Sequence, residues 1–149
     1  MDTAETLQGY QISLSIRHPS MAPDAITAQL HMIPQYKWKR GERRKTPRGT
    51  VLPGVRNETR WRHVRPFVQG RLFFDGVKAM LTTLEPNADF LSKVASEGGQ
   101  VTILVNLPGY VNIGDVLDAA TLKRLADLQV ALSVEVFPTI QRGWPGFRD

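Results

Sequence analysis

The chain has 149 residues, no cysteine and a formal charge of +5. This length is typical of one domain with a substantial core. Disulfides and thiolate metal sites are excluded, and a reducing compartment is compatible with this composition. Residues 1–8 carry Asp2 and Glu5 and lack the apolar centre of a signal peptide. No apolar stretch approaches the ~20 residues of a membrane span. We therefore expect a cytoplasmic protein with a flexible tail over residues 1–8.

The first regular element is a strand over Tyr10–Arg17, where apolar and polar residues alternate. A period of two predicts one face toward the core and one toward water. His18 and Pro19 end this strand. Pro23 suits the first turn of a short helix, which ends before Pro34.

A long basic loop is predicted over residues 36–58, which follow no periodic pattern apart from a possible short strand near Tyr36–Lys39. Eleven Lys and Arg and only two acids lie between Tyr36 and Arg65, so this segment carries +9 and the rest of the chain −4. We expect residues 41–56 to be exposed and mobile, because a buried loop would leave its backbone polar groups unpaired. The candidate binding residues are Lys37, Trp38, Lys39, Arg40, Arg43, Arg44, Lys45 and Arg48.

The remaining strands are predicted from a period of two and the remaining helices from a period of about 3.6 residues. A strand over Thr59–Val64 turns Trp61 into the core. Two helices then meet at Pro86, and Gly98 ends the second of them. The last elements are a strand over Val101–Leu107, a helix capped by Asp118 with the stripe Leu122, Leu125 and Leu128, and a strand over Val130–Phe137.

This order predicts a single α+β domain over residues 9–138, followed by an irregular tail over residues 139–149. The expected architecture is a two-layer sandwich, whose mixed or mainly antiparallel four-stranded sheet carries the helices on one face, as in ferredoxin-like folds. Alternating strands leave the other face wet. That face is a second candidate surface for a partner or a second copy, and its residues are Gln11, Ser13, Ser15, Arg17, Thr102, Asn106, Ser133 and Glu135.

Several of these pieces, taken in order, resemble a known family. They are the strand ending in Ile16–Ser20, the helix ending at Pro34, the Trp38–Gly41 turn, Trp61, Leu84–Pro86, and Leu122–Phe137. Over roughly Tyr10–Pro138 the chain resembles the bacterial family catalogued as domain of unknown function 4279. The resemblance implies this α+β fold and no established activity. Arg43–Asn57 and the tail after Pro138 look like features of this chain alone.

Residues that mark common metal and catalytic sites are missing or scattered. His18, His31 and His63 lie in different elements without a carboxylate at ligand spacing, so we expect no metal. The sequence has no nucleophile elbow and no phosphate-binding glycine loop. We expect no cofactor and no catalytic residue. An enzyme assembled from scattered residues is the least favoured alternative.

Two pairs of acids could in principle serve acid–base chemistry, which needs neighbouring carboxyl groups. Asp115 lies near Asp118, and Glu85 lies near Asp89. Both pairs flank the starts of predicted helices, where acids stabilise the helix dipole. We therefore interpret them as structural.

The basic segment indicates an anionic partner. One candidate is an acidic protein, and an immunity-type inhibitor of a toxin is an example by analogy. The other is nucleic acid, for which Tyr36, Trp38 and Trp61 would offer stacking surfaces. The core is nevertheless the favoured place for both tryptophans. The alternative without any partner is a solvated loop whose charges only aid solubility.

Overall fold

The computed structural model describes residues 8–109 and 112–137, so the predicted tails lie outside the described residues, apart from Gln8. The elements in chain order are β1 (Gly9–His18), α2 (Pro23–Leu30), β2 (Tyr36–Trp38), β3 (Arg43–Lys45), β4 (Val51–Val55), β5 (Thr59–Val64), β6 (Val68–Gln69), α3 (Phe74–Leu84), a 3₁₀ turn η1 (Glu85–Asn87), α4 (Ala88–Ser96), β7 (Gln100–Pro108), α5 (Ala119–Asp127) and β8 (Val130–Phe137).

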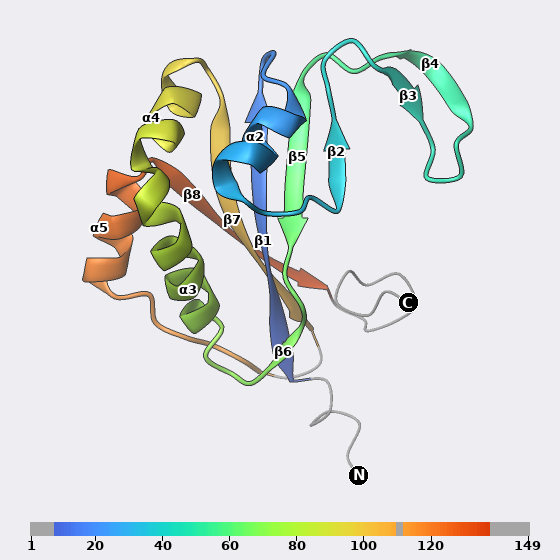
Figure 1. The fold of residues 1–149 in the computed structure, drawn as a ribbon. Coiled ribbons are helices and arrows are strands. Elements are labelled where there is room, and N and C mark those ends of the chain that lie inside the picture. Colours follow the sequence, from blue (N-terminus) through green and yellow to red (C-terminus); the bar gives the residue numbers. More distant parts are fainter. Residues whose placement is uncertain (1–7, 110–111, 138–149) are drawn as a thin grey trace.

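The described elements form two layers, with the α-helices covering one face of the main sheet (Figure 1). The sheet has the order β2-β5-β1-β7-β8, and β6 pairs with the start of β1. Its pairs are antiparallel except β7–β8, which are parallel and joined through α5. The predicted two-layer α+β sandwich with a mainly antiparallel sheet is confirmed.

Two details of the sheet differ from the expectation. The four predicted strands lie side by side as β5-β1-β7-β8, but β2 and β6 make the sheet six-stranded. In addition, β7 and β8 are direct neighbours, so the β7-α5-β8 unit is not the split βαβ unit of a ferredoxin-like fold. The resemblance to ferredoxin-like folds is therefore one of layers rather than of strand order.

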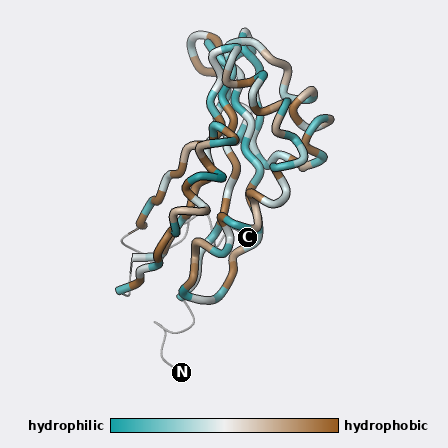
Figure 2. The backbone as a smooth tube through the Cα atoms, turned by 90° about the vertical axis from the view of Figure 1, so that its left-hand side faces the viewer, coloured by the Kyte–Doolittle hydropathy of each residue, from teal (hydrophilic) through white to brown (hydrophobic). Residues whose placement is uncertain are grey.

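The core lies between the sheet and the helices and is built from the apolar side of each alternating strand. The tube in Figure 2 shows this alternation of hydrophilic and hydrophobic residues along the chain. Ile12 and Ile103 belong to one buried cluster, and Leu132 packs against it, as the alternation predicts. Within the described residues, no helix combines the length and apolar character needed to cross a bilayer.

Trp61 lies in this core, as expected. Its side chain is 1% exposed, and its indole Nε1 donates a hydrogen bond to Thr27 Oγ1 of α2 at 3.0 Å. The hydrogen bond satisfies the one polar atom of a large buried ring. Trp61 therefore joins α2 to β5 and fixes the position of the strand that also carries Arg60 and Arg62 on its other face.

Candidate functional site

The centre of the predicted basic loop is a β-hairpin. Strands β3 and β4 pair with each other in a separate two-stranded sheet. The hairpin is closed at its base by two backbone hydrogen bonds, from Gly41 N to Arg56 O (2.7 Å) and from Arg56 N to Glu42 O (2.8 Å). We call residues 40–56 the basic arm. It extends away from the two-layer body (Figure 1). The short strand expected near Tyr36–Lys39 is present as β2, but the expectation of a loop without regular structure over the rest of residues 36–58 is wrong, since β3 and β4 lie in it.

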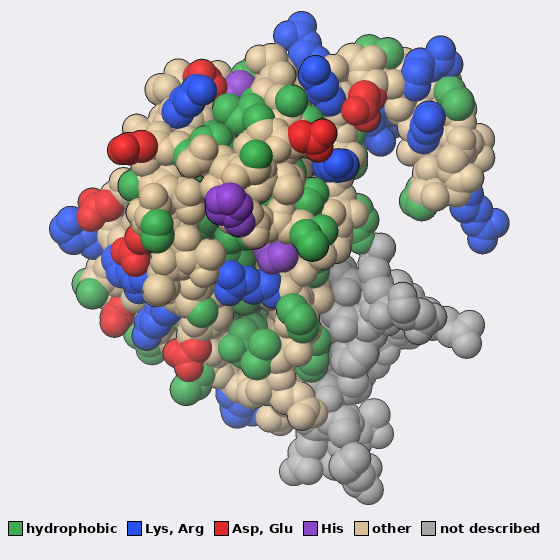
Figure 3. Space-filling view, viewed as in Figure 1, with side chains coloured by type: hydrophobic (Ala, Val, Ile, Leu, Met, Phe, Trp, Pro, Cys, Tyr) green, Lys and Arg blue, Asp and Glu red, His purple; other side chains and the backbone are tan. Residues whose placement is uncertain are grey.

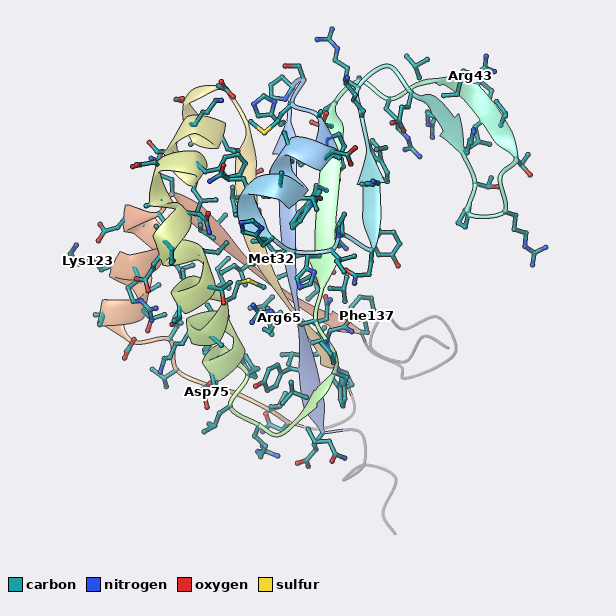
Figure 4. All side chains as sticks on the ribbon, in the orientation of Figure 1. Met32, Arg43, Arg65, Asp75, Lys123 and Phe137 are labelled. Atoms are coloured by element: carbon teal, nitrogen blue, oxygen red, sulfur yellow. The ribbon has the colours of Figure 1, made fainter. Side chains whose placement is uncertain are left out.

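Most of the predicted binding residues lie on this arm. Arg43, Arg44 and Lys45 form β3, and all three are exposed. Figure 3 shows Lys and Arg side chains spread along the arm, and Figure 4 shows Arg43 far from the helices. The arm's cations are Arg40, Arg43, Arg44, Lys45, Arg48 and Arg56. None of them takes part in an ion pair formed within residues 8–109 and 112–137. The predicted exposure of the segment is confirmed, whereas its mobility stays a prediction.

Lys37 and Trp38 lie at the root of the arm and point to opposite faces of the sheet. Lys37 lies on the helix side, where its Nζ is 3.1 Å from Asp24 Oδ1. The expectation that Trp38 lies in the core is wrong: Trp38 is half-buried on the helix-free face, and the guanidinium carbon of Arg56 lies 4.0 Å from its ring centroid. This cation–π contact attaches the arm to the sheet. Lys37 is thus separated from the arm's cations, whereas Trp38 is in contact with one of them.

A second feature is a cavity of about 590 Å³ on the helix-free face of the sheet, next to the root of the arm. Small-molecule sites commonly have volumes of ~300–1,000 Å³. Neighbouring strands supply most of its lining, and the segment after β5 supplies the rest. The lining includes Gln11, Ser13 and Ser15 of β1, Asn106 of β7, Arg60, Arg62 and Val64 of β5, Tyr36 and Trp38 of β2, and Arg65, Pro66 and Phe67 after β5.

The floor of this cavity corrects the expectation of a wet face. Gln11, Ser13 and Asn106 are only 5%, 1% and 2% exposed. They are buried although they lie on the face that the helices leave open, and they share the cavity lining with Pro66 and Phe67 of the segment after β5. Gln11 Oε1 and Asn106 Oδ1 are buried without a hydrogen-bond partner. Buried polar atoms are nearly always paired, so two orphans in one cavity point to a function of this face.

The two arginines of β5 on this face differ in their surroundings. Arg60 Nε lies 3.0 Å from Glu58 Oε1, so its charge is compensated locally. Arg62 lies opposite both Ser15 of β1 and Tyr36 of β2. In the part of the chain that the structure describes, no carboxylate pairs with Arg62. Arg62 therefore brings to the cavity a positive charge that no described carboxylate compensates.

Arg65 follows β5 and turns toward the helices instead. Its guanidinium donates to Thr83 Oγ1 of α3 at 3.3 Å, and Figure 4 shows it beside that helix. Burial lowers the pKa of Arg65 from its ordinary value. An arginine remains charged even so, and the hydrogen bond to Thr83 directs the half-buried guanidinium of Arg65 toward α3.

The acid pairs are used at helix termini, in agreement with the structural interpretation. Asp115 Oδ2 accepts from Phe74 N at the start of α3 (3.0 Å), and Asp118 Oδ1 accepts from Thr121 N at the start of α5 (2.9 Å). Hydrogen bonds from Thr121 lower the pKa of Asp118. Glu85 pairs with Arg124 at 2.7 Å, and this hydrogen bond lowers the pKa of Glu85.

His18 has a structural role at the end of β1. Its Nδ1 accepts from the backbone N–H groups of Ser20 (3.0 Å) and Met21 (2.8 Å), and its Nε2 lies 2.9 Å from Glu97 Oε1. Nδ1 therefore carries no proton, and Nε2–H donates to Glu97. Among the described residues, no three His, Asp or Glu are grouped as metal ligands would be.

Brief treatment with trypsin is expected to cut the basic arm before any other part of the chain. Its cations are exposed, and a two-stranded hairpin alone is marginally stable. The two fragments stay associated because β1, before the cut, pairs with β5, after it. Mass spectrometry locates the cut, and gel filtration shows whether the fragments separate. First cuts in the helices, with an intact arm, would contradict this expectation.

Comparison with known proteins places the chain in a family. A family model described as Domain of unknown function (DUF4279) matches residues 8–137, a range that contains every described strand and helix and also the basic arm. No curated protein and no solved structure matches the chain. The resemblance expected from the sequence is confirmed, and the arm lies inside the matched range. The chain belongs to the family described as Domain of unknown function (DUF4279).

Proposed function

We propose that this chain is a non-catalytic binding protein, which holds an acidic protein partner on its basic arm. The observation that carries the proposal is the group of six arm cations, which project from the body without a carboxylate partner among the described residues. Charges of one sign on a projecting element steer an oppositely charged partner toward it. The cysteine-free sequence supports a cytoplasmic location.

The side chains beside these cations favour a protein as the partner. Val51 and Val55 of β4 are 49% and 54% exposed, and they lie opposite Lys45 and Arg43. A surface of alternating cations and valines gains from burial of the valines as well as from charge. Phosphate backbones offer little for valines to bury against. An immunity-type protein that holds an acidic toxin is one example, by analogy alone.

Nucleic acid is the second candidate, and the shape of the arm favours it. A two-stranded β-ribbon fits the major groove of DNA, and Lys and Arg neutralise phosphates. The arm is such a ribbon, with three consecutive cations, Arg43–Lys45, in one strand. Binding would then be carried mainly by phosphate contacts, which are strongly salt-dependent.

The test compares the native protein with a variant in which Arg43, Arg44 and Lys45 are all changed to Ser. The control changes three cations outside the arm, Lys78, Lys93 and Lys123, to Ser, so both variants lose the same charge. Each protein is used to isolate partners from cells that make the chain, at low and at high salt. We expect one acidic protein to bind the native protein and the control, and to be lost from the arm variant.

A library of DNA and RNA, titrated at several salt concentrations, separates the two candidates. A nucleic-acid partner would bind with an affinity that falls by about 0.9 log units per log unit of salt for each phosphate neutralised. An acidic protein with buried contacts keeps more of its affinity at high salt. Equal binding of every partner by the native protein and the arm variant would show that the arm is not the contact surface.

A further inference from the structure

We propose that the cavity on the helix-free face of the sheet binds a nucleotide, with the base at Gln11 and Asn106 and the phosphate at Arg62. This inference does not depend on the basic arm, since none of these three residues lies within it. It rests on two buried amides whose oxygens have no partner, on an arginine without a carboxylate partner among the described residues, and on aromatic side chains that line the same cavity.

The two amides form a recognition edge. Gln11 and Asn106 are directly opposed on β1 and β7, so their side chains lie side by side on one face, with Cβ atoms ~5 Å apart. Both are at least nine-tenths buried, both line the cavity, and the oxygen of each has no partner. A ligand N–H that donates to these oxygens relieves the cost of leaving them unpaired.

A nucleobase suits this edge better than a simple anion or an apolar molecule does. A carboxamide has donors and an acceptor, and Asn and Gln pair with the donor and acceptor atoms of base edges, as they do with adenine in DNA. An inorganic anion has no N–H to offer the two oxygens, and an apolar ligand would leave both oxygens unpaired. Two neighbouring carboxamides can therefore form hydrogen bonds with the edge of one base and distinguish it from other bases.

Aromatic side chains line both ends of the cavity. Phe67, in the segment after β5, lies at the amide end, close to Gly9 of β1, whereas Tyr36 of β2 lies opposite Arg62 and Trp38 lies opposite Arg60. Aromatic rings stack on bases, whatever the base, and this adds affinity without selecting among bases. Selection among bases is then left to Gln11 and Asn106.

Arg62 lies at the other end of the same face. Arg62 is opposite Ser15, which lies four residues along β1 from Gln11. Four residues of strand span ~14 Å, and the long arginine side chain can shorten the distance between its guanidinium and Gln11. A base, a sugar and a phosphate in sequence match such a separation, whereas an amino acid is too short. The guanidinium forms strong paired hydrogen bonds with phosphate.

The test uses the four ribonucleoside 5′-monophosphates, titrated into the full chain by calorimetry. We expect at least one to bind at millimolar concentration or below. Arg62→Gln should weaken that nucleotide by roughly ten- to a hundredfold, because a hydrogen-bonded charge is lost. The same change should leave the corresponding nucleoside, which has no phosphate, unaffected. Arg44→Gln, on the arm, is the control and should change neither affinity.

Asn106→Leu tests the base end of the site. It should remove the preference among the four nucleotides. The melting temperature of the ligand-free protein should stay equal or rise, because an apolar side chain of similar size replaces an unpaired buried amide. A loss of nucleotide preference in a protein that is equally or more stable is a change in recognition and not in folding.

A short single-stranded RNA identifies the source of the nucleotide. If the strand binds more tightly than the free nucleotide and the gain is lost on changing Arg43, Arg44 and Lys45 to Ser, the natural ligand is a nucleotide within a strand. If the strand does not bind, the natural ligand is a free nucleotide. The proposal is overturned if none of the four nucleotides binds at millimolar concentration, or if binding is unchanged in both Arg62→Gln and Asn106→Leu.

Discussion

Trp61→Ala is expected to lower the free energy of unfolding by about 3–5 kcal/mol, as for other large buried aromatics. The indole is 1% exposed and fills the space between β5 and α2. Its removal leaves a cavity that close-packed neighbours fill only in part, and it deprives Thr27 Oγ1 of its donor. Urea denaturation, monitored by circular dichroism, measures the change in the free energy of unfolding.

Trp38→Ala is the matched control, because Trp38 belongs to the neighbouring strand β2 and is only half-buried. Its main described contact is the stacking of Arg56, so we expect a loss of about 1 kcal/mol. If the two variants unfolded at the same urea concentration, the assignment of Trp61 to the core and of Trp38 to the surface would be wrong.

Gly76→Leu is expected to cost about 3 kcal/mol, the upper end of the usual range for overpacking. Gly76 lies in the first turn of α3, where the helix approaches β1 closely. A Cβ at this position would lie 2.5 Å from Ile12 Cγ1 and 2.8 Å from Tyr10 Cε2. A leucine adds three further carbons, so α3 must move away from the sheet. Thermal unfolding and urea denaturation measure the loss of stability, and the m-value of urea denaturation reports whether the compactness of the native state has changed.

Gly114→Leu is the control for this prediction, because a Cβ at Gly114 has nothing within 4 Å. We expect Gly114→Leu to change the free energy of unfolding little. Gly76→Ala should give an intermediate loss, since it introduces the close contact and also improves helix propensity by ~1 kcal/mol. An unchanged stability of Gly76→Leu would mean that α3 is not packed against β1 as described.

The strands with one apolar face were predictable almost residue by residue. Thr59–Val64 and Val130–Phe137 have the predicted bounds, because their alternation has the period of a strand. In β8 the alternation reaches the core only at Val130 and Leu132, since Val134 and Val136 are exposed. The helix after Asp118 was predictable in its start and in most of its buried face. Leu125 and Leu128 are buried as predicted, but Leu122 is 52% exposed and its neighbour Thr121 is buried instead. The orientation of so short a helix is decided by its packing on the sheet, which the sequence pattern alone does not contain.

The basic arm was recognisable as a charged segment but not as a hairpin. Its strands leave both faces in solvent, so neither face selects apolar residues and no alternation arises. Pro53 and Gly54 lie inside β4 and usually argue against a strand. They are tolerated here because β4 pairs with β3 on one side only.

The cavity could not be predicted, because Gln11 and Asn106 look like ordinary solvent-facing residues of alternating strands. Their burial depends on tertiary packing on this face of the sheet, which an alternating pattern does not contain. One signal was present in the sequence. Arg60 and Arg62 alternate with Trp61, so the placement of Trp61 in the core already directs both arginines to the opposite face of the sheet, the face that also carries Gln11.

The closed base of the arm has a consequence for how the chain can diverge. Gly41 and Arg56 are held together by a backbone hydrogen bond of 2.7 Å, so the ends of the arm stay adjacent whatever lies between them. Lengthening such a segment adds little closure entropy, about 0.6 kcal/mol for each doubling. Relatives can therefore lengthen, shorten or exchange the arm without disturbing the core, and changes of partner should accumulate there while Gly41 and the Trp38–Arg56 contact persist.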